Sequence, residues 1–479
     1  MSFARQNLSL LIEVNNICTS NGLLEKFKNT ESSFDLYFRS VPDNGGFAIL
    51  AGLSQVVELL ENLHFDESDI SFLTSLNELN DEFIEYLKDF KFQCDVWSIP
   101  EGTPVFPEEP VLVVKGPAIQ TQLIESLLLS SINHQTLIAT KANRVCRAAH
   151  RKCVVESGLR KAHSYDSALY GARASYIGGV EYTTNLLASK EFSIPTLPLM
   201  NHSFVQMFES EYDAFKSYCE IYGDKSVLLV DTYNILKSGV VNAIKVFDEV
   251  LKPKGERPLG IKIDSGDITY YTRKARKMLD DAGYPDCKIF VSNSLDEYVI
   301  RDMLNQGANV DSFVVGEKLI TSATSPIFTG VYKMTSVFEN DKEYPVIKLS
   351  ENVSKITTPC LKQSWRLFDR VTGKCLCDVI TKFDEIIDDN KDYEIFDPVH
   401  TWKRKNICNF ISRPMLKQVF DKGVCVYPKY SVMEIKKYCK SQCELLWEEV
   451  KRFENPHKYY VDLSQSVWDE KRKLLEKYN

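Results

Sequence analysis

Four short apolar runs decide the fold of this chain: Ser226-Val-Leu-Leu-Val230, Leu259-Gly-Ile-Lys-Ile263, Lys288-Ile-Phe-Val291 and Phe313-Val-Val315. Each run is rich in β-branched residues and is followed at once by polar residues, a pattern that predicts buried strands. Amphipathic segments of helical length connect the first three runs to their successors. The repeated strand–loop–helix unit predicts an α/β fold with a parallel sheet or barrel.

The polar residues after these runs are predicted to share one edge of the sheet. In parallel α/β folds the functional residues gather at the carboxyl ends of the strands. We therefore expect one face to carry the following residues: Asp231, Asp264, Asp267, Asn293, Gly316 and Lys318.

The length and composition of the chain limit the classes of function that it can have. The chain has 479 residues, 44% hydrophobic and 26% charged, which is ordinary for a globular protein of two or three domains. Its net charge of −8 gives no reason to expect nucleic-acid binding. No apolar run approaches the ~20 residues of a membrane span, and no signal-peptide core is present. Thirteen scattered cysteines without a Cys-x-x-Cys pair favour reduced thiols, a cytoplasmic location and no structural metal site.

The regions before and after the repeated unit have different patterns. Strands around Phe34–Phe38, Cys94–Gly102 and Pro110–Lys115 predict an antiparallel sheet near the N-terminus. Residues 119–149 predict a long buried helix, and residues 194–200 a further barrel strand. Short strands at 345–349, 363–368 and 377–380 and two terminal helices at 431–452 and 464–478 predict a C-terminal extension. We expect three domains: an N-terminal α+β domain (1–125), an α/β barrel (126–340) and the extension (341–479).

A basic stripe follows along the long predicted helix, comprising Lys141, Arg144, Arg147 and Arg151. A solvated helix face is its simplest interpretation, and a phosphate-facing role is the alternative.

Asp264 and Asp267 bracket Ser265-Gly266 after the second run. Such a pair can bind the two hydroxyls of a ribose or a Mg²⁺ held between phosphates. The alternative is a helix cap, since a helix is predicted from Ile268. Grouping with Asp231 and Asn293 favours a functional role. Gly316 lies where late barrel strands commonly bind phosphate, although turns use glycine everywhere.

Two histidines and three basic residues are further candidates. His202 follows the predicted strand at 194–200 and is suited to be a nucleophile or proton carrier, and His163 is open to the same interpretation. For both, a structural histidine is the alternative. Arg160, Lys161 and Arg173 are suited to bind anions, with surface ion pairs as the alternative.

Several segments together resemble the nicotinate phosphoribosyltransferase family, from the predicted Phe34 strand to the last helix. Besides the strand ends at Asp231, Asp264, Asn293 and Lys318, the resemblance rests on Gln135-Thr-Leu-Ile-Ala-Thr-Lys141, Ala172-Arg-Ala-Ser-Tyr-Ile-Gly-Gly179 and Asn455-Pro-His-Lys-Tyr-Tyr-Val-Asp-Leu463. It implies an irregular α/β barrel of the type II phosphoribosyltransferase kind. It also implies a homodimer with shared active sites, Mg²⁺ as cofactor, and nicotinate, phosphoribosyl pyrophosphate (PRPP) and ATP as substrates.

The resemblance also implies roles for individual residues. Asp264 would hold the ribose hydroxyls, Arg160 the phosphates or a carboxylate, and Asn293 and Gly316 the region of the 5′-phosphate. His202 matches the histidine that ATP phosphorylates. Asp231, Asp267, Lys318 and Arg173 complete the expected substrate site.

The chain departs from the family pattern around the base and the phosphate. An aliphatic Val14 stands where the family has a tyrosine that stacks on the pyridine ring. Ser157 and Leu159 replace a phenylalanine and a threonine, and Glu317 places a carboxylate where the threonine of the phosphate loop's Gly-Val-Gly-Thr would offer a hydroxyl to the phosphate. Lost ring contacts cost about 1–3 kcal/mol each. A transferase for another base, or an inactive paralogue that serves as a binding protein, are therefore the competing hypotheses. Tyr165, Tyr170 and Tyr233 are the candidates to refill the base site.

Overall fold

The computed structural model describes residues 7–478, which divide into two compact units. The barrel unit comprises residues 141–326, and the terminal unit comprises residues 7–140 together with 327–478. The expected boundaries at 125/126 and 340/341 therefore differ from those of the compact units. The chain before the barrel and the chain after it form one unit, because their strands pair with each other.

The barrel unit contains six strands in the order β7-β6-β11-β10-β9-β8, and every neighbouring pair is parallel. β7 and β8 are edge strands, so the sheet does not close and the barrel is irregular, as the family resemblance implies. All four apolar runs form strands of this sheet. The strands are β6 (Cys153–Glu156), β7 (Tyr182–Thr183), β8 (Val227–Leu229), β9 (Gly260–Ile263), β10 (Lys288–Val291) and β11 (Ser312–Val315).

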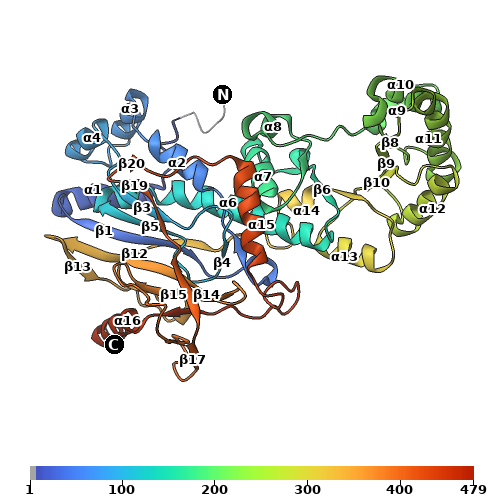
Figure 1. Cartoon of the computed structure of the whole chain (residues 1–479). Helices are drawn as coiled ribbons and strands as arrows, with labels where there is room; N and C mark the ends of the chain where they lie inside the picture. The colour runs from blue at the N-terminus through green and yellow to red at the C-terminus, as the bar shows by residue number, and fades with distance from the viewer. Residues whose placement is uncertain (1–6, 479) are drawn as a thin grey trace. The chain divides into compact units, whose positions relative to one another are not determined.

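Helices connect these strands, and α11 and α12 lie outside β8, β9 and β10 (Figure 1). Asp267 and Asp296 accept hydrogen bonds from the first turns of α12 and α13, which explains where these two helices begin. The helices are α7 (Tyr165–Gly178), α8 (Leu186–Phe192), α9 (His202–Gln206), α10 (Glu211–Tyr222), α11 (Val240–Val246), α12 (Ile268–Asp281), α13 (Glu297–Asn305) and α14 (Glu317–Ile320).

The main sheet of the terminal unit is antiparallel throughout, in the order β13-β12-β1-β5-β3-β19-β20. The predicted antiparallel pairing of β3 with β5 is confirmed. Its central strands come from the N-terminal region, and its edges come from beyond the barrel. The strands are β1 (Glu31–Phe38), β3 (Asp95–Ser98), β5 (Leu112–Pro117), β12 (Gly330–Glu339), β13 (Lys342–Pro345), β19 (Lys417–Asp421) and β20 (Val424–Cys425).

A second sheet in the same unit has the order β18-β14-β15-β21. Its central pair, β14 with β15, contains the predicted strands at 363–368 and 377–380. The small sheets β2–β4 and β16–β17 complete the unit. The bounds are β2 (Ala48–Ile49), β4 (Pro104–Val105), β14 (Lys362–Asp369), β15 (Cys375–Lys382), β16 (Tyr393–Phe396), β17 (Arg404–Ile407), β18 (Phe410–Pro414) and β21 (Val461–Leu463).

Among the described residues, two helices of the terminal unit begin at reciprocal capping boxes. Asp66 with Asp69, and Ser431 with Glu434, form reciprocal capping boxes. The helices are α1 (Val14–Phe27), α2 (Leu53–Glu61), α3 (Glu67–Ser75), α4 (Asp81–Lys88), α5 (Ala118–Leu123), α15 (Val432–Glu444) and α16 (Gln465–Tyr478); α6 (Glu125–Ala148) crosses the boundary between the units.

Three local predictions were wrong. Residues 194–200 contribute only a single bridge, Thr183 with Thr196, because Pro195 and Pro198 lack the N–H groups that a ladder needs. The strand expected at 345–349 ends at Pro345 instead. The helix expected over 119–149 is two helices, which meet at Ile124.

The solvated interpretation of the basic stripe on α6 was also wrong for two of its members. The side chains of Lys141 and Arg144 are 1% and 3% exposed, respectively. Both bind the carboxylate of Glu297, the first residue of α13. A buried acid on a distant element therefore compensates charges that the local pattern assigned to solvent.

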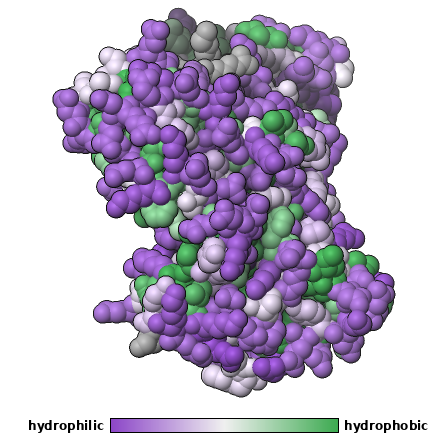
Figure 2. Space-filling model, turned by 90° about the vertical axis from the view of Figure 1, so that its left-hand side faces the viewer, coloured by the Kyte–Doolittle hydropathy of each residue, from purple (hydrophilic) through white to green (hydrophobic). Residues whose placement is uncertain are grey.

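Among the described residues, no helix is long and apolar enough to cross a membrane. The face drawn in Figure 2 is mostly hydrophilic, and its hydrophobic patches are small and separate.

Candidate functional site at the strand ends of the barrel

The carboxyl ends of β8 and β9 are joined through Asp231. Its Oδ2 accepts a hydrogen bond from the backbone N–H of Asp264 at 2.9 Å and another from the hydroxyl of Ser265 at 2.8 Å. The Oδ1 of Asp231 is buried and makes no hydrogen bond with the described residues. The two acids that the sequence placed at one edge are thus in direct contact through the loop backbone.

Asp264 extends this network to the end of β10. Its Oδ1 accepts a hydrogen bond from the hydroxyl of Ser292, and its Oδ2 lies 3.6 Å from the amino group of Lys262. Three neighbouring parallel strands therefore end in one connected set of polar groups. Ser292 and Ser265 were not singled out from the sequence, although both lie in the polar ends that follow the apolar runs.

The loop after β10 has an unusual backbone. Asn293 and Ser294 have φ angles of 97° and 47°, a region that non-glycine residues rarely occupy. Such backbone strain is found preferentially at functional sites. The hydroxyl of Ser294 donates to Glu317 Oε1 at 2.7 Å, which ties this loop to the loop after β11.

The carboxylate of Glu317 has two favourable partners, the hydroxyl of Ser294 and the amino group of Lys161. The hydrogen bond from Ser294 lowers the pKa of its carboxyl group, and the nearby amino group of Lys161, 3.5 Å away, lowers it further. Glu317 is therefore ionised at neutral pH and held by two donors. These two contacts partly neutralise the negative charge of Glu317 beside the loop that the resemblance assigns to phosphate.

Lys318, which we expected to bind the substrate, contacts an acid of the protein. Its amino group donates to Asp296 Oδ2 at 2.7 Å. Asp296 also accepts from the backbone N–H groups of Tyr298 and Val299, at 3.0 and 2.8 Å. Burial alone would raise the pKa of Asp296, but the hydrogen bonds from Lys318 and Val299 outweigh it and lower the pKa. Lys318 thus connects the β11 loop to the start of α13.

The end of β6 lies beside the end of β11 and supplies a further buried acid, Glu156. Glu156 is 2% exposed, and it accepts hydrogen bonds from the hydroxyl of Thr183 and the N–H of Gly158. Burial raises its pKa, and these two hydrogen bonds partly oppose that shift. Gly158 is required here, because a Cβ at this position would meet the Cβ of Ile320 at 2.5 Å.

The turn that follows β6 presents three side chains to solvent. Leu159, Arg160 and Lys161 form a short 3-10 helix and are all exposed. Arg160 is therefore accessible, next to the Lys161 that contacts Glu317. Ser157 accepts a hydrogen bond from Thr184 at 3.3 Å.

His202 is connected to the same edge through Thr232. Its Nδ1 lies 3.2 Å from the hydroxyl of Thr232, which directly follows Asp231. The ring is half-buried at the first turn of α9. His163, the other candidate, is exposed just before α7. Of the two histidines, His202 is therefore the one that the structure joins to the strand ends.

Arg173 and Asp267, two other candidates for the substrate site, make contacts within the protein. Arg173 is buried within α7, where its guanidinium lies over the ring of Phe192. Asp267 caps α12 by accepting from the N–H of Tyr270 at 2.9 Å, so the capping interpretation applies to one of its oxygens. A substrate role for either stays a prediction.

The three tyrosines considered for the base site differ in exposure. Tyr170 is buried against Phe192, whereas Tyr165 and Tyr233 are 60% and 62% exposed. Tyr233 follows Thr232 at the end of β8, and Tyr165 begins α7. An accessible ring is therefore available at two positions.

Comparisons with known proteins identify related chains. The model of the nicotinate phosphoribosyltransferase (NAPRTase) N-terminal domain matches residues 10–133, and that of the C-terminal domain matches residues 361–471. The nicotinate phosphoribosyltransferase of Bacillus subtilis is 40% identical over 457 residues, covering 95% of this chain and 91% of the relative.

Two solved structures share the fold. Human nicotinic acid phosphoribosyltransferase superimposes with a TM-score of 0.84 at 24% identity, covering 97% of this chain and 99% of the human chain. A nicotinate-nucleotide pyrophosphorylase of Pyrococcus furiosus has a TM-score of 0.69 at 22% identity, covering 93% and 98%. These two proteins have different names, so their shared fold does not by itself identify the reaction of this chain.

Proposed function

The chain belongs to the nicotinate phosphoribosyltransferase family, and we propose that it joins nicotinate to PRPP, giving nicotinate mononucleotide and pyrophosphate. The observation that carries this proposal is the connected set of Asp231, Asp264 and Ser292 at neighbouring strand ends. Such a set offers fixed oxygen acceptors to the hydroxyls of a ribose.

Asp264 is the residue assigned to the ribose. Its carboxylate is oriented by Ser292 and is only partly buried, so an oxygen can accept a hydrogen bond from a sugar hydroxyl. A fixed carboxylate near C1′ also stabilises the positive charge that develops when pyrophosphate leaves. Asp231 contributes by holding the Asp264 loop in place.

The strained loop at Asn293 and the loop at Gly316 are assigned to the 5′-phosphate. Both follow late strands of the barrel, a common position for phosphate binding. Lys318 and Lys161 supply positive charge nearby, each in contact with an acid of the same loops. Arg160 is exposed beside them and is assigned to the pyrophosphate or to the nicotinate carboxylate.

Mg²⁺ fits the residues present. Carboxylate oxygens suit this cation, and Asp231 Oδ1 has no hydrogen-bond partner among the described residues. Asp231 and Asp264 would hold the ion together with phosphate oxygens of the substrate. When bound, it would stabilise the negative charge of the departing pyrophosphate.

ATP is the proposed co-substrate, and His202 its proposed acceptor. Thr232 contacts Nδ1 of the ring and thereby orients it, which leaves Nε2 available for phosphorylation. The proposal includes a homodimer and a cytoplasmic location. The exposure of Leu11 and Val14, at 48% and 62%, supports an interface near the start of α1. Size-exclusion chromatography with light scattering tests the dimer.

A transferase for a different base is the second candidate. It is favoured by the aliphatic side chains of Val14 and Leu159 at positions where the family has a tyrosine and a threonine. If nicotinate is the base, the exposed Tyr165 or Tyr233 supplies a ring face.

Incubating the purified chain with nicotinate, PRPP, Mg²⁺ and ATP tests the proposal, with nicotinate mononucleotide as the measured product. Product formation supports it. A thermal shift with PRPP but no turnover of nicotinate supports the second candidate. Absence of both product and shift would leave only the fold and would favour an inactive paralogue.

A further inference from the structure

The terminal unit contains a cavity that the proposed reaction does not use. Its volume is about 1150 Å³, and it is formed by residues of four segments: 39–46, 106–108, 395–405 and 455–462. All four segments belong to the terminal unit. Cavities that bind small molecules commonly have volumes of about 300–1000 Å³, so this one has room for a metabolite.

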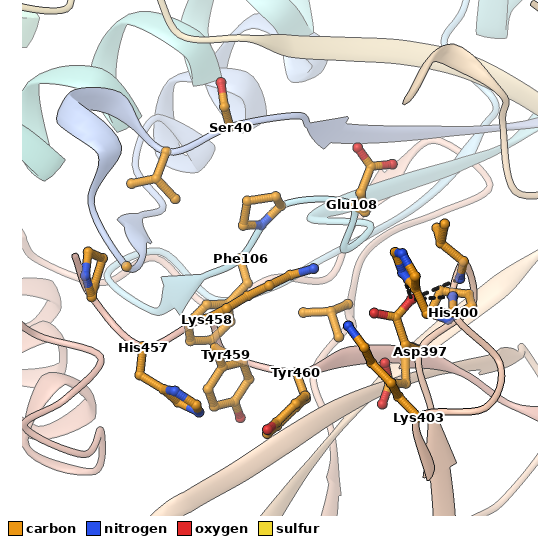
Figure 3. A pocket seen from close by; sticks show the side chains of 18 of the residues that line it. Ser40, Phe106, Glu108, Asp397, His400, Lys403, His457, Lys458, Tyr459 and Tyr460 are labelled. Atoms are coloured by element: carbon orange, nitrogen blue, oxygen red, sulfur yellow. Dashed lines mark hydrogen bonds and ion pairs between the residues drawn. The ribbon is translucent and has the colours of Figure 1, made fainter. Parts of the chain in front are cut away.

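Two lysines contribute positive charge to the interior of the cavity. Lys403 and Lys458 reach into it from different walls, and their amino groups face its interior (Figure 3). Neither amino group forms a hydrogen bond or an ion pair within the part of the chain that the structure describes. Arg39 and Lys405 also line the cavity.

The acids of the cavity do not cancel this charge. Asp397 is ionised: burial opposes its ionisation, but the N–H groups of His400 and Val399 and the charge of Lys458 outweigh burial and lower its pKa. Burial raises the pKa of Glu108 to about 7, and burial together with Asp397 raises that of Asp462 to about 7. At neutral pH the cavity therefore carries more positive than negative charge.

One wall of the cavity is aromatic and rigid. Phe106 and Tyr459 stack with ring centroids 3.7 Å apart, and the hydroxyl of Tyr459 donates to the buried Asp378 at 3.0 Å. Tyr460 beside them is 40% exposed, with His457 at its edge and the amino group of Lys405 5.5 Å from its centroid. Tyr460 thus offers an accessible ring face close to cationic groups.

We propose that this cavity is a second ligand site, which binds a nucleoside phosphate. The phosphate would contact Lys403 and Lys458, and the base would stack on Tyr460. An accessible aromatic face next to unpaired amino groups matches a ligand that is planar at one end and anionic at the other. A phosphate without a ring, or a ring without a phosphate, would use only half of the site.

Calorimetric titration of the full chain with adenosine 5′-monophosphate (AMP) tests the proposal, with adenosine and inorganic phosphate as partial probes. We expect one AMP per chain, and at least about 10-fold weaker binding of each partial probe, since each lacks one contact. Inorganic phosphate binding as tightly as AMP would overturn the nucleoside part of the proposal. Absence of AMP binding would overturn all of it.

Substitutions of the two cavity lysines test where AMP binds. The double variant Lys403→Glu/Lys458→Glu should weaken AMP at least about 10-fold, because it replaces two attractive charges by repulsive ones. Lys417→Glu/Lys440→Glu is the matched control, with the same change of charge at exposed lysines outside the cavity. Equal affinities in the two double variants would contradict the proposal. Both lysines of the cavity are exposed, so an unchanged melting temperature is expected.

The Asp264→Asn variant separates this site from the barrel site. AMP should bind it as tightly as it binds the unmodified chain. Loss of AMP binding in Asp264→Asn, with normal binding in Lys403→Glu/Lys458→Glu, would assign AMP to the barrel and overturn the proposal. Tyr460→Ala should weaken AMP about 10-fold, the size of one stacking contact, and leave phosphate binding unchanged.

Discussion

The amino group of Lys141 lies 2.8 Å from Glu297 Oε2, and both side chains are fully buried. Lys141 also donates to Thr324, and Arg144 donates to Glu297 Oε1 at 2.8 Å and to the hydroxyl of Tyr298. Glu297 directly follows Asp296, the partner of Lys318. The buried charges of α6 therefore fix the start of α13, and with it the loop that carries Asn293.

Glu297→Gln should strongly destabilise the protein. Two buried cations would face a neutral amide, and breaking a buried ion pair costs about 3–5 kcal/mol. Urea denaturation measures the free energy of unfolding. Asp302→Asn, an exposed change on the same helix, is the control and should stay within about 0.5 kcal/mol. A loss no larger than that of the control would show that the pair contributes little.

Asp264→Asn should reduce kcat/KM for the transferase reaction at least about 100-fold, because the carboxylate charge acts on the transition state. The fold should survive, since the side chain lies at a half-exposed strand end. Steady-state kinetics and a melting curve provide the two measurements. Asp281→Asn, at the exposed end of α12, should keep full activity. Normal turnover in Asp264→Asn would remove this residue from the site.

His202→Ala should abolish the stimulation by ATP while leaving some ATP-independent turnover. The imidazole is the proposed phosphate acceptor, and its Nδ1 contacts Thr232, which lies beyond the end of β8. His163→Ala is the matched control, since His163 is exposed and was the competing candidate. Rates with and without ATP, and phosphate incorporation from labelled ATP, measure the effect. Unchanged stimulation in His202→Ala, or its loss in His163→Ala, contradicts the assignment.

Asp462→Asn should change how stability depends on pH. Burial and Asp397 raise the pKa of Asp462 to about 7, so its folded state holds a proton more tightly than its unfolded state. Its contribution to stability is complete below the unfolded pKa of about 4 and is lost as pH rises towards 7. The neutral amide avoids that loss.

The variant should therefore match the unmodified chain near pH 4 and exceed its stability at pH 8 by roughly 2–4 kcal/mol. Urea denaturation at both pH values gives the comparison. A difference that does not vary between pH 4 and pH 8 would mean that Asp462 titrates normally.

Much of the barrel could be predicted because its strands are encoded locally. Apolar β-branched runs such as 313–315 are buried on both faces of a parallel sheet, so their composition is sufficient to identify them. The shared edge followed from the direction of the strands, and the contact of Asp231 with the Asp264 loop bears this out. The partners Ser265 and Ser292 were not identified, because hydroxyl groups are common in every loop.

The errors arose where a distant segment decides the environment. Lys141 and Arg144 have the spacing of a solvated stripe, and only the position of Glu297, more than a hundred residues later, makes their burial possible. Lys318 has the position of a phosphate ligand, but Asp296 is its partner here. The cavity around Lys403 and Lys458 unites four segments that share no local signal.

By itself, the sequence determined the parallel barrel strands, their polar ends and the family, because alternation, composition and motifs are properties of neighbouring residues. Tertiary structure decided which charges are buried, which acids have a raised pKa and which lysines have no acidic partner among the described residues. Those properties depend on desolvation and on partners brought together by folding, which no local pattern encodes.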